Sequence, residues 1–183
     1  MFSQALTEIT SLLEKAKTNG LVQKYALIGG FAVSAWGVPR ATNDLDFALA
    51  VGSADPGDLA TLLKAEFHPG DLNDPLRGVF RCSLKIEDYT IPVQLILLPA
   101  VWEHLVFQKV VSLAVFGCTV PVVNWQSLVL LKLYAGGPQD LLDARQILAV
   151  RQPNRNELQE VTQLAEQVNL LADFQALAIR LPD

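Results

Sequence analysis

The segment "NDLDFALA", residues 43–50, places two carboxylates in a stretch that is otherwise apolar. Side chains alternate along a strand with a period of two, so Asp44 and Asp46 point to one face while Leu45 and Phe47 point to the other. Two neighbouring ionised carboxylates repel each other, and burying an unpaired charge is costly. We therefore expect a positive partner between the two carboxylates. It is an arginine or lysine side chain, a shared proton, or a divalent cation that the carboxylates bind.

Apolar periodicity and turn residues divide the rest of the chain into short elements. Expected helices cover residues 3–17, 31–36, 56–66, 125–135, 140–150, 156–167 and 171–179, and expected strands cover 25–28, 44–50, 79–86, 91–98, 110–116 and 119–123. The polar, turn-rich stretch 68–78 is expected to be a loop. We expect a core over residues 1–124 with a helical part over 125–183 packed on it, or alternatively one single domain.

Composition limits the classes of protein to consider. Apolar residues make up 51% of the 183 residues and charged residues 18%, which excludes disorder. No apolar stretch reaches the roughly 18 to 20 residues that span a bilayer, and the N-terminal segment does not resemble a signal peptide. A cytoplasmic location is therefore expected, with Cys82 and Cys118 reduced. The net charge of -5 argues against broad coating of nucleic acid but allows a local basic groove.

Two glycines, Gly29 and Gly30, lie where the short apolar strand "YALI" meets a short helix. A glycine turn allows close backbone approach, and free N–H groups at a helix start suit a phosphate; the alternative is a tight turn that only glycine tolerates. Thirteen residues separate Gly30 from Asp44, enough for a short helix and a return loop to a neighbouring strand. We expect the carboxylates beside the glycine turn, as a metal-bound nucleoside triphosphate requires.

The stretch "LIGGFAVSAWGVPRATNDLDFAL" resembles the signature of the nucleotidyltransferase superfamily with the minimal polymerase-beta-like fold. The matching positions are Ile28, Gly29, Gly30, Asp44, Leu45, Asp46 and Phe47. Further on, "VPVVNWQSLVLLKLYAGGPQDLLDARQIL" resembles the second motif of the AbiEii-like branch, in which a lysine on a helix is followed by an aspartate. Lys132 and Asp140 match these positions, and the resemblance covers about residues 22–148. Members of this branch include toxin components of bacterial toxin–antitoxin and phage-defence systems.

The resemblance implies an α+β fold, with a nucleotidyltransferase-type mixed β-sheet of roughly four to six strands, packed helices and a helical C-terminal part. It also implies that Asp44 and Asp46 hold Mg2+ or Mn2+. Gly29 and Gly30 would contact phosphate, and Lys132 would contact the nucleotide or the charge of the transition state. Because Lys132 lies among apolar residues, the alternative is that its side chain extends outward to solvent.

One family position departs from the pattern. The third carboxylate of the family lies on a neighbouring strand, and the aligned stretch "IPVQLILLP" has Gln94 there. A carboxamide is a poor base, so metal-assisted transfer is expected to be impaired while metal-nucleotide binding survives. Glu87 and Asp88 are the nearest acids in sequence, and an extended strand would put Asp88 about 20 Å from Gln94.

Five more residues have two interpretations each. Arg40 meets a triphosphate or directly neutralises Asp44, and Thr42 belongs to the nucleotide site or turns the loop. Asp140 contacts the nucleotide or interacts with the dipole of its helix as a first-turn acid. Arg81 and Lys85 alternate on one strand face, where they line an acceptor groove or are simply solvated.

The sequence therefore predicts a magnesium-dependent nucleotidyltransferase-like protein that binds a nucleoside triphosphate and transfers a nucleoside monophosphate to a hydroxyl. A role as the toxin of a toxin–antitoxin pair, with an antitoxin partner, is a further expectation. The alternative is a catalytically degenerate module for partner binding or nucleotide sensing. The leucine stripes of the C-terminal helices predict ordinary packing, or alternatively a homo-oligomer or partner surface.

Overall fold

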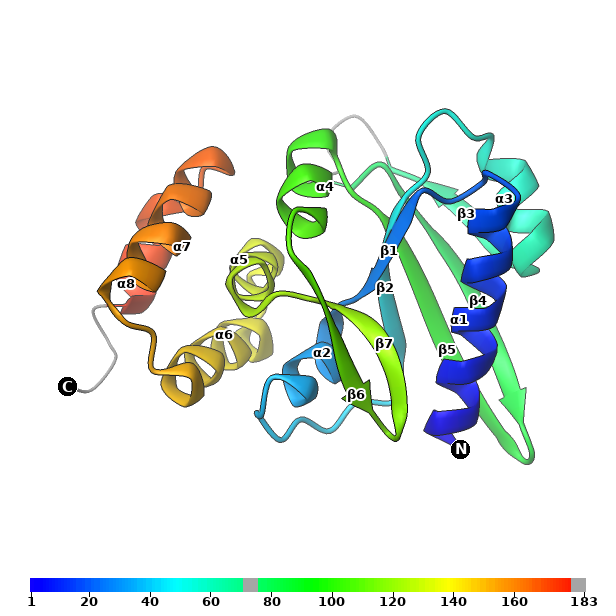
Figure 1. Cartoon of the computed structure of the whole chain (residues 1–183), viewed down its shortest axis with the longest axis horizontal. Coiled ribbons are helices and arrows are strands. Elements are labelled where there is room, and N and C mark those ends of the chain that lie inside the picture. Colours follow the sequence, from blue (N-terminus) through cyan, green and yellow to red (C-terminus); the bar gives the residue numbers. More distant parts are fainter. Residues whose placement is uncertain (71–75, 179–183) are drawn as a thin grey trace.

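The computed structural model describes residues 1–70 and 76–178 (Figure 1). Its helices are α1 (Phe2–Thr18), α2 (Gly29–Ala35), α3 (Pro56–Leu63), α4 (Ala100–Phe107), α5 (Trp125–Ala135), α6 (Pro138–Arg151), α7 (Arg155–Gln167) and α8 (Leu171–Ala178). Its strands are β1 (Lys24–Leu27), β2 (Leu45–Ala50), β3 (Glu66–Pro69), β4 (Gly78–Ile86), β5 (Tyr89–Leu97), β6 (Val110–Val115) and β7 (Cys118–Val123).

The seven strands form one mixed sheet in the order β3-β4-β5-β2-β1-β7-β6. Strand β2 is parallel to β5, and β1 is parallel to β7, whereas all other neighbours are antiparallel. The α+β fold with a mixed sheet and packed helices is therefore confirmed. The expected strand number of four to six is too low, because β3 was not recognised.

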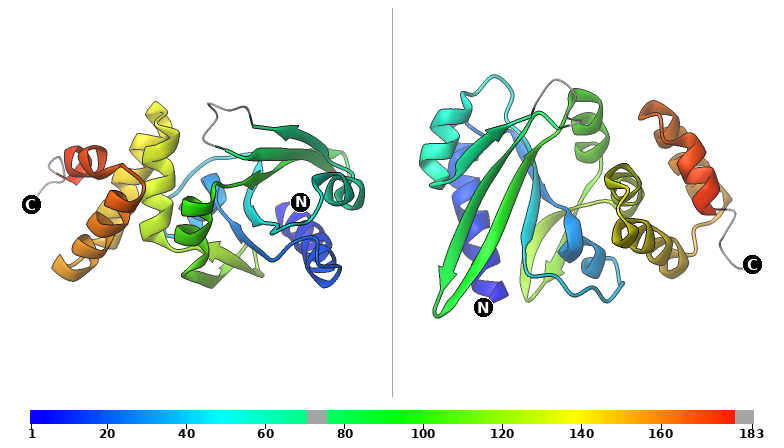
Figure 2. Two further views of the ribbon diagram at one scale, coloured as in Figure 1. Left: turned by 90° about the horizontal axis from the view of Figure 1, so that it is seen from above. Right: turned by 180° about the vertical axis from the view of Figure 1, so that it is seen from behind.

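The two faces of the sheet differ in burial along β2, β5 and β4. Phe47, Leu95 and Phe80 are neighbours across these strands and are completely buried. Helix α1 packs on this side, where Tyr25 of β1 contacts Phe47 and hydrogen-bonds to Glu14 of α1. Viewed from behind, β4 and β5 lie in front of α1 with no helix across them (Figure 2, right). The opposite face of these two strands is thus open.

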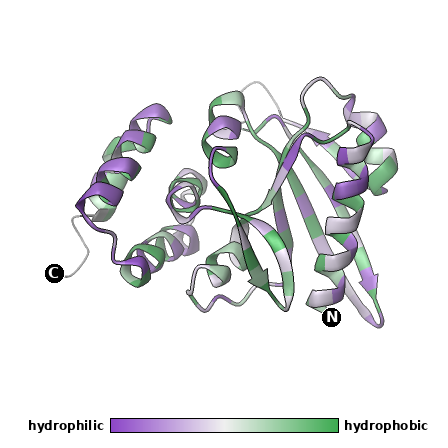
Figure 3. Ribbon diagram, viewed as in Figure 1, coloured by the Kyte–Doolittle hydropathy of each residue, from purple (hydrophilic) through white to green (hydrophobic). Residues whose placement is uncertain are grey.

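Helices α5 to α8 gather beside the sheet rather than under it (Figure 1). Coloured by hydropathy, the central strands are largely apolar, while α1 and α7 show both colours, as amphipathic helices do (Figure 3). Helix α5 is buried on almost every side, because it lies between the sheet-packed α2 and α4 and the outer helices α6 to α8. No helix of the described part of the chain combines the length and apolarity that a membrane span needs.

Most element assignments from the sequence agree with the structure to within a few residues. The strands at 79–86 and 91–98 form the β4–β5 hairpin, and those at 110–116 and 119–123 form the β6–β7 hairpin. The last expected helix was to end at Ile179, which lies outside the described residues.

The expected helix 56–66 and the expected loop 68–78 both differ from the structure, and helix α4 was not expected from the sequence. The expected helix 56–66 ends at Leu63, because Lys64 has the left-handed conformation, with φ 50°. Strand β3 (Glu66–Pro69) occupies the end of that expected helix and the start of the expected loop 68–78, of which residues 71–75 lie outside the described part. Helix α4 was missed because apolar residues cover it too evenly to give a helical period.

Candidate functional site

The turn between β1 and α2 brings the backbone against the side chain of Asp46. Gly29 has a φ of +65°, and a Cβ atom at this position would lie 2.0 Å from Asp46 Oδ2. At Gly30 a Cβ atom would lie 2.8 Å from the Cβ of Thr42. Contacts within the chain thus require both glycines, whether or not a phosphate binds, and the sequence expectation that the carboxylates lie beside this turn is correct for Asp46.

Asp44 and Asp46 lie close enough to repel each other, and neither forms an ion pair within the described residues. Burial, and then repulsion by Asp44, raise the pKa of Asp46 to about 7, although Lys132 and Arg40 act in the opposite direction. Thr42 Oγ1 donates a hydrogen bond to Asp44 Oδ1. Among the described residues, no lysine or arginine nitrogen lies within 4.0 Å of either carboxylate. The pair therefore retains the electrostatic need for a proton or a cation.

The interpretation that Arg40 directly neutralises Asp44 is wrong. Arg40 Nε lies 3.3 Å from Asp143 Oδ1 instead. This ion pair holds the loop before β2 against α6, and Arg40 Nη1 also donates to the backbone oxygen of its neighbour Ala41. Arg40 remains close enough to lower the pKa of Asp46. It therefore contributes positive potential to the site without forming an ion pair with Asp44 or Asp46.

Lys132 lies at the centre of a buried group of charges. Its Nζ lies 2.8 Å from Asp140 Oδ1 and 3.0 Å from Asp143 Oδ2, and only 10% of its side chain is exposed. Asp143 is fully buried and also accepts a hydrogen bond from Gln139 Nε2 at 2.8 Å. Asp140 lies in the first turn of α6, as the helix-dipole interpretation expects, and it also forms an ion pair with Lys132.

Asp143 was missed by sequence reasoning, although a signal was present. It follows Asp140 by three residues in "DLLD", and positions i and i+3 of a helix share one face. The apolar setting of Lys132 in "LVLLKLYA" indicated that its charge needs a buried partner. The sequence offered Asp140 as the match, and the structure shows that Lys132 contacts both carboxylates.

A cavity of about 360 Å³ joins these charges to an apolar surface. Its polar lining comes from Asp46, Lys132 and Asp140, with the backbone of Gly29. The remaining lining is largely aliphatic and comes from Ile28, Leu76, Ile96, Leu98, Leu128, Leu131, Tyr134 and Ala135. Such a cavity, with one charged end and one apolar wall, suits an amphipathic ligand, and two of the three charged side chains at that end are carboxylates.

Gln94 occupies the position next to Asp46 in the sheet. The two residues are in register on the parallel strands β5 and β2, so their side chains share one face. Glu87 and Asp88 form the exposed turn of the β4–β5 hairpin, several residues along the strand from Gln94. Neither acid replaces the third carboxylate.

The carboxylate pair fits a divalent cation that is shared with phosphate. Within residues 1–70 and 76–178, no group of three or more His, Cys, Asp or Glu side chains is arranged to hold a metal ion. Magnesium, however, commonly binds one or two carboxylates together with substrate phosphates and water. Asp44 and Asp46 would supply the carboxylates of such a site, where a cation would balance the charge repulsion that raises the pKa of Asp46.

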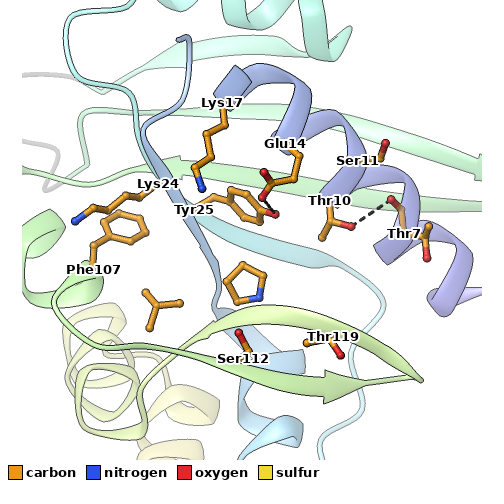
Figure 4. Close-up of a pocket in the computed structure, with 12 residues that line it drawn as sticks. Thr7, Thr10, Ser11, Glu14, Lys17, Lys24, Tyr25, Phe107, Ser112 and Thr119 are labelled. Atoms are coloured by element: carbon orange, nitrogen blue, oxygen red, sulfur yellow. Dashed lines mark hydrogen bonds between the residues drawn. The ribbon is translucent and has the colours of Figure 1, made fainter. Parts of the chain in front are cut away.

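A larger hollow of about 790 Å³ lies elsewhere, between α1 and the β6–β7 hairpin (Figure 4). Hydroxyl groups of α1 line it, and Tyr25 donates a 2.6 Å hydrogen bond to Glu14. Burial and Glu14 raise the pKa of Tyr25, which stays a donor. None of the residues singled out from the sequence lines this hollow, so size alone does not identify the site.

The fold is similar to solved nucleotidyltransferase structures. A nucleotidyltransferase-like antigenic protein from Paracoccidioides brasiliensis gives a TM-score of 0.50 at 19% identity, over 93% of this chain and 90% of that one. ANT(2'')-Ia in complex with adenylyl-2''-tobramycin gives 0.52 at 14% identity, over 94% and 98%. The solution structure of the antibiotic-resistance factor ANT(2'')-Ia gives 0.50 at 16% identity, over 96% and 94%.

No family model matches the chain, and no curated protein matches it. The class that the structure defines is therefore the nucleotidyltransferase-like fold.

Proposed function

We propose that this protein binds a complex of a nucleoside triphosphate with Mg2+ or Mn2+ and transfers the nucleoside monophosphate to a hydroxyl group. The observation that carries the proposal is the pair of Asp44 and Asp46, which has no ion pair with a basic side chain of the described residues and of which Asp46 lines a cavity together with Lys132. A carboxylate such as Asp46, whose pKa is raised by burial and by a neighbouring carboxylate at a cavity, is typical of a functional site rather than of a structural ion pair.

Each residue has a distinct role in this proposal. Asp44 and Asp46 hold the cation, which, when bound, supplies charge neutralisation and aligns the phosphates. Thr42 orients Asp44 through its hydroxyl group. Lys132 and Arg40 add positive potential that favours negative charge on the transferred phosphoryl group.

The nucleotide is expected to use both ends of the 360 Å³ cavity. Its phosphates would lie near Lys132 and Asp46, beside the backbone of Gly29 and Gly30, while its base would contact the aliphatic wall. Asp140 contributes indirectly, because it holds Lys132 at 2.8 Å on the cavity wall.

Gln94 supports a second candidate function, a catalytically degenerate module that binds nucleotide or a partner. In an active transferase the acceptor hydroxyl must lose a proton, and a carboxamide does not accept one at neutral pH. In this alternative Asp44 and Asp46 would still hold a metal-nucleotide, and the neutral Gln94, in register with Asp46, would stand where the resemblance expects a third carboxylate. If the protein is such a degenerate module, it should bind the metal-nucleotide without transferring a nucleoside monophosphate.

The finer assignment to the AbiEii-like branch rests on the sequence spacing of Lys132 and Asp140. These two residues form an ion pair in the structure. Under this assignment the protein is a cytoplasmic toxin component that an antitoxin partner holds in check. Its test is expression in bacteria, where the wild type would arrest growth and Asp46→Asn would not.

A thermal-shift experiment tests the proposed function directly. At a hundredfold excess over the dissociation constant, Mg2+ with a nucleoside triphosphate stabilises the protein by about 2.7 kcal/mol. Asp44→Asn should abolish the shift, whereas Asp88→Asn, on the exposed hairpin turn, should keep it. The same melting temperature for the wild type with and without metal-nucleotide would refute the site.

A transfer assay then separates the two candidate functions. The protein is incubated with α-labelled nucleoside triphosphates, Mg2+ or Mn2+, and acceptors that include cell RNA, the protein itself and small alcohols. Labelled acceptor formed by the wild type, and not by Asp44→Asn, supports the transferase. Nucleotide binding without any labelled acceptor supports the degenerate module.

A further inference from the structure

The open face of the sheet continues from the carboxylates toward the edge strand β3. Asp46 of β2 is in register with Gln94 of β5, Gln94 with Arg81 of β4, and Arg81 with Glu66 of β3. Paired positions on neighbouring strands share one face, and each strand adds about 4.8 Å. Arg81 therefore starts about 10 Å from Asp46 on the same open face.

Lys85 extends the positive charge along this face. It lies four residues after Arg81 on β4, about 13 Å along the strand, and both residues are exposed. Between them on the same face lies Ser83, and opposite on β5 lie Thr90 and Pro92, which are exposed and uncharged. Among the described residues, no helix covers β4 and β5 on this side (Figure 2, right).

The positive charge of this face is not consumed by ion pairs. None of the ion pairs that the structure shows within residues 1–70 and 76–178 involves Arg81 or Lys85. Glu66, the neighbour of Arg81 on β3, lies 3.5 Å from His68 Nε2 instead.

The exchange of the third carboxylate for Gln94 changes which acceptors the face tolerates. A carboxylate at this position would put a negative charge between Asp46 and Arg81, and would repel an anionic acceptor from the cation site. A carboxamide removes that repulsion and can donate hydrogen bonds to an anionic oxygen. Going outward from Asp46, the face therefore has the neutral Gln94 first and then Arg81, whose next neighbour on β3 is Glu66.

We propose that this open face is the acceptor site and that the acceptor is a small phosphorylated alcohol. Its phosphate would bind Arg81 and Lys85, while its free hydroxyl would lie near Asp46. The proposal rests on the proposed transferase function and names the substrate class of that same site. The net charge of -5 favours a small acceptor over a long nucleic acid, which would need an extended basic surface.

The reaction at this face balances without a further reactant. The acceptor oxygen forms a bond to the α-phosphorus, and the bond between that phosphorus and the oxygen leading to the β-phosphate breaks. Pyrophosphate leaves with the electron pair of that bond, and the hydroxyl proton passes to a carboxylate or to water. Arg81 takes no part in bond making, so it acts as a specificity-determining residue.

Binding of ribose 5-phosphate, measured by isothermal titration calorimetry, tests the acceptor class. The wild type is expected to bind ribose 5-phosphate at least tenfold more tightly than ribose or the cationic tobramycin. Arg81→Gln should weaken this binding about tenfold and Lys85→Gln several-fold. Arg155→Gln and Lys15→Gln, which make the same charge changes on exposed helical positions, should leave it unchanged.

Parallel titrations with Mg-ATP and with a short single-stranded RNA separate the proposals. Mg-ATP affinity should be the same for Arg81→Gln and the wild type. A loss of Mg-ATP affinity in Arg81→Gln would assign this arginine to the nucleotide and overturn the acceptor proposal. Tighter binding of RNA or tobramycin than of ribose 5-phosphate, or equal binding by Arg81→Gln and the wild type, would also overturn it. Failure of Mg-ATP to bind, with Arg81-dependent binding of ribose 5-phosphate retained, would refute only the proposed nucleotide function.

Discussion

Lys132 Nζ lies 3.0 Å from Asp143 Oδ2, and the same carboxylate approaches Arg40 Nε at 3.3 Å through its other oxygen. One fully buried aspartate thus holds two cations that come from different segments, α5 and the loop before β2. Both cations lower the pKa of Asp46. The charge balance of the carboxylate pair therefore depends on a residue in α6 that does not contact it.

Removing the charge of Asp143 should destabilise the fold strongly. Breaking a buried ion pair costs about 3–5 kcal/mol, and we expect Asp143→Asn to lie near 3 kcal/mol, because Lys132 keeps Asp140 as a partner. For a chain of this size, that loss corresponds to a fall in melting temperature of about 6–12 °C. Asp140→Asn is the matched comparison, and it should cost less, since 28% of its side chain is exposed. A larger loss in Asp140→Asn would contradict this account.

The pKa of Asp46 predicts an unusual dependence of stability on pH. Its value of about 7 in the folded protein exceeds the ordinary 3.8, so the folded state retains a proton that the unfolded state has lost. The free energy of unfolding should therefore fall as pH rises from about 4 to 7, in the absence of divalent metal. Asp46→Asn has no charge to lose, so its melting temperature should exceed that of the wild type at pH 8 by a few degrees.

The measurement is the difference between the melting curves of the wild type and Asp46→Asn across pH 4 to 8. Other titrating groups are common to both proteins and cancel in this difference. Addition of Mg2+ should raise the melting temperature of the wild type at pH 8 and leave that of Asp46→Asn unchanged. Parallel pH profiles for the two proteins would show that the burial of Asp46 carries no free-energy cost.

Local patterns predicted the parts of this site that depend on one or two neighbouring strands. Alternation identified the β4–β5 hairpin, and the spacing from Gly30 to Asp44 placed the carboxylate strand beside the glycine turn. Period two also placed Gln94 on the face of Asp46, which the register of β5 and β2 shows.

Contacts between helices were beyond the reach of the same reasoning. The partner of Arg40 depends on how α6 packs against the loop before β2, and no periodicity encodes that contact. Asp143 was missed for the same reason, since its partner Lys132 lies on another helix. Helix α4 was missed because its apolar residues lack a period, and β3 because a left-handed Lys64 ended the preceding helix early.

Gly29→Ala should disrupt the site through Asp46 and not only through backbone strain. Gly29 and Gly20 both have a left-handed φ, +65° and +75°, but a Cβ atom would meet Asp46 Oδ2 at 2.0 Å in the first case and nothing within 4 Å in the second. Gly20→Ala should lose about 1–2 kcal/mol from the left-handed conformation alone. Gly29→Ala should lose about 1–3 kcal/mol more from steric overlap. Denaturant unfolding of both variants measures the difference.

The same substitution in an Asp46→Ala background completes a double-mutant cycle. The extra loss in Gly29→Ala should become smaller there, because the carboxylate that overlaps the new methyl group is gone, but it should not vanish, because the Cβ of residue 46 would still lie 2.8 Å from that methyl group. An unchanged loss in that background would place the strain in the turn itself.

Gln94→Asp should convert the neutral position beside Asp46 into a third carboxylate. Without metal, three carboxylates on one face repel each other, so the variant should melt below the wild type at pH 8. Mg2+ with a nucleoside triphosphate should reverse that order, because the added oxygen donors strengthen cation binding. The conservative variant Gln94→Asn, which adds no charge, should follow the wild type in both conditions. These thermal measurements test the geometry independently of any turnover.

The catalytic consequence is measured with labelled nucleoside triphosphates and the acceptor panel. A carboxylate at position 94 would accept the proton of the acceptor hydroxyl, and general-base catalysis typically accelerates a reaction by about 10²–10⁴-fold. Transfer by Gln94→Asp alone would identify the wild type as a degenerate transferase that retains binding. If the wild type transfers robustly and Gln94→Asp does not increase the rate, the proton leaves by another route. Asp46, whose pKa lies near 7, is then the group to replace next. Absence of both transfer and nucleotide binding in the two proteins would leave the fold as a partner-binding module.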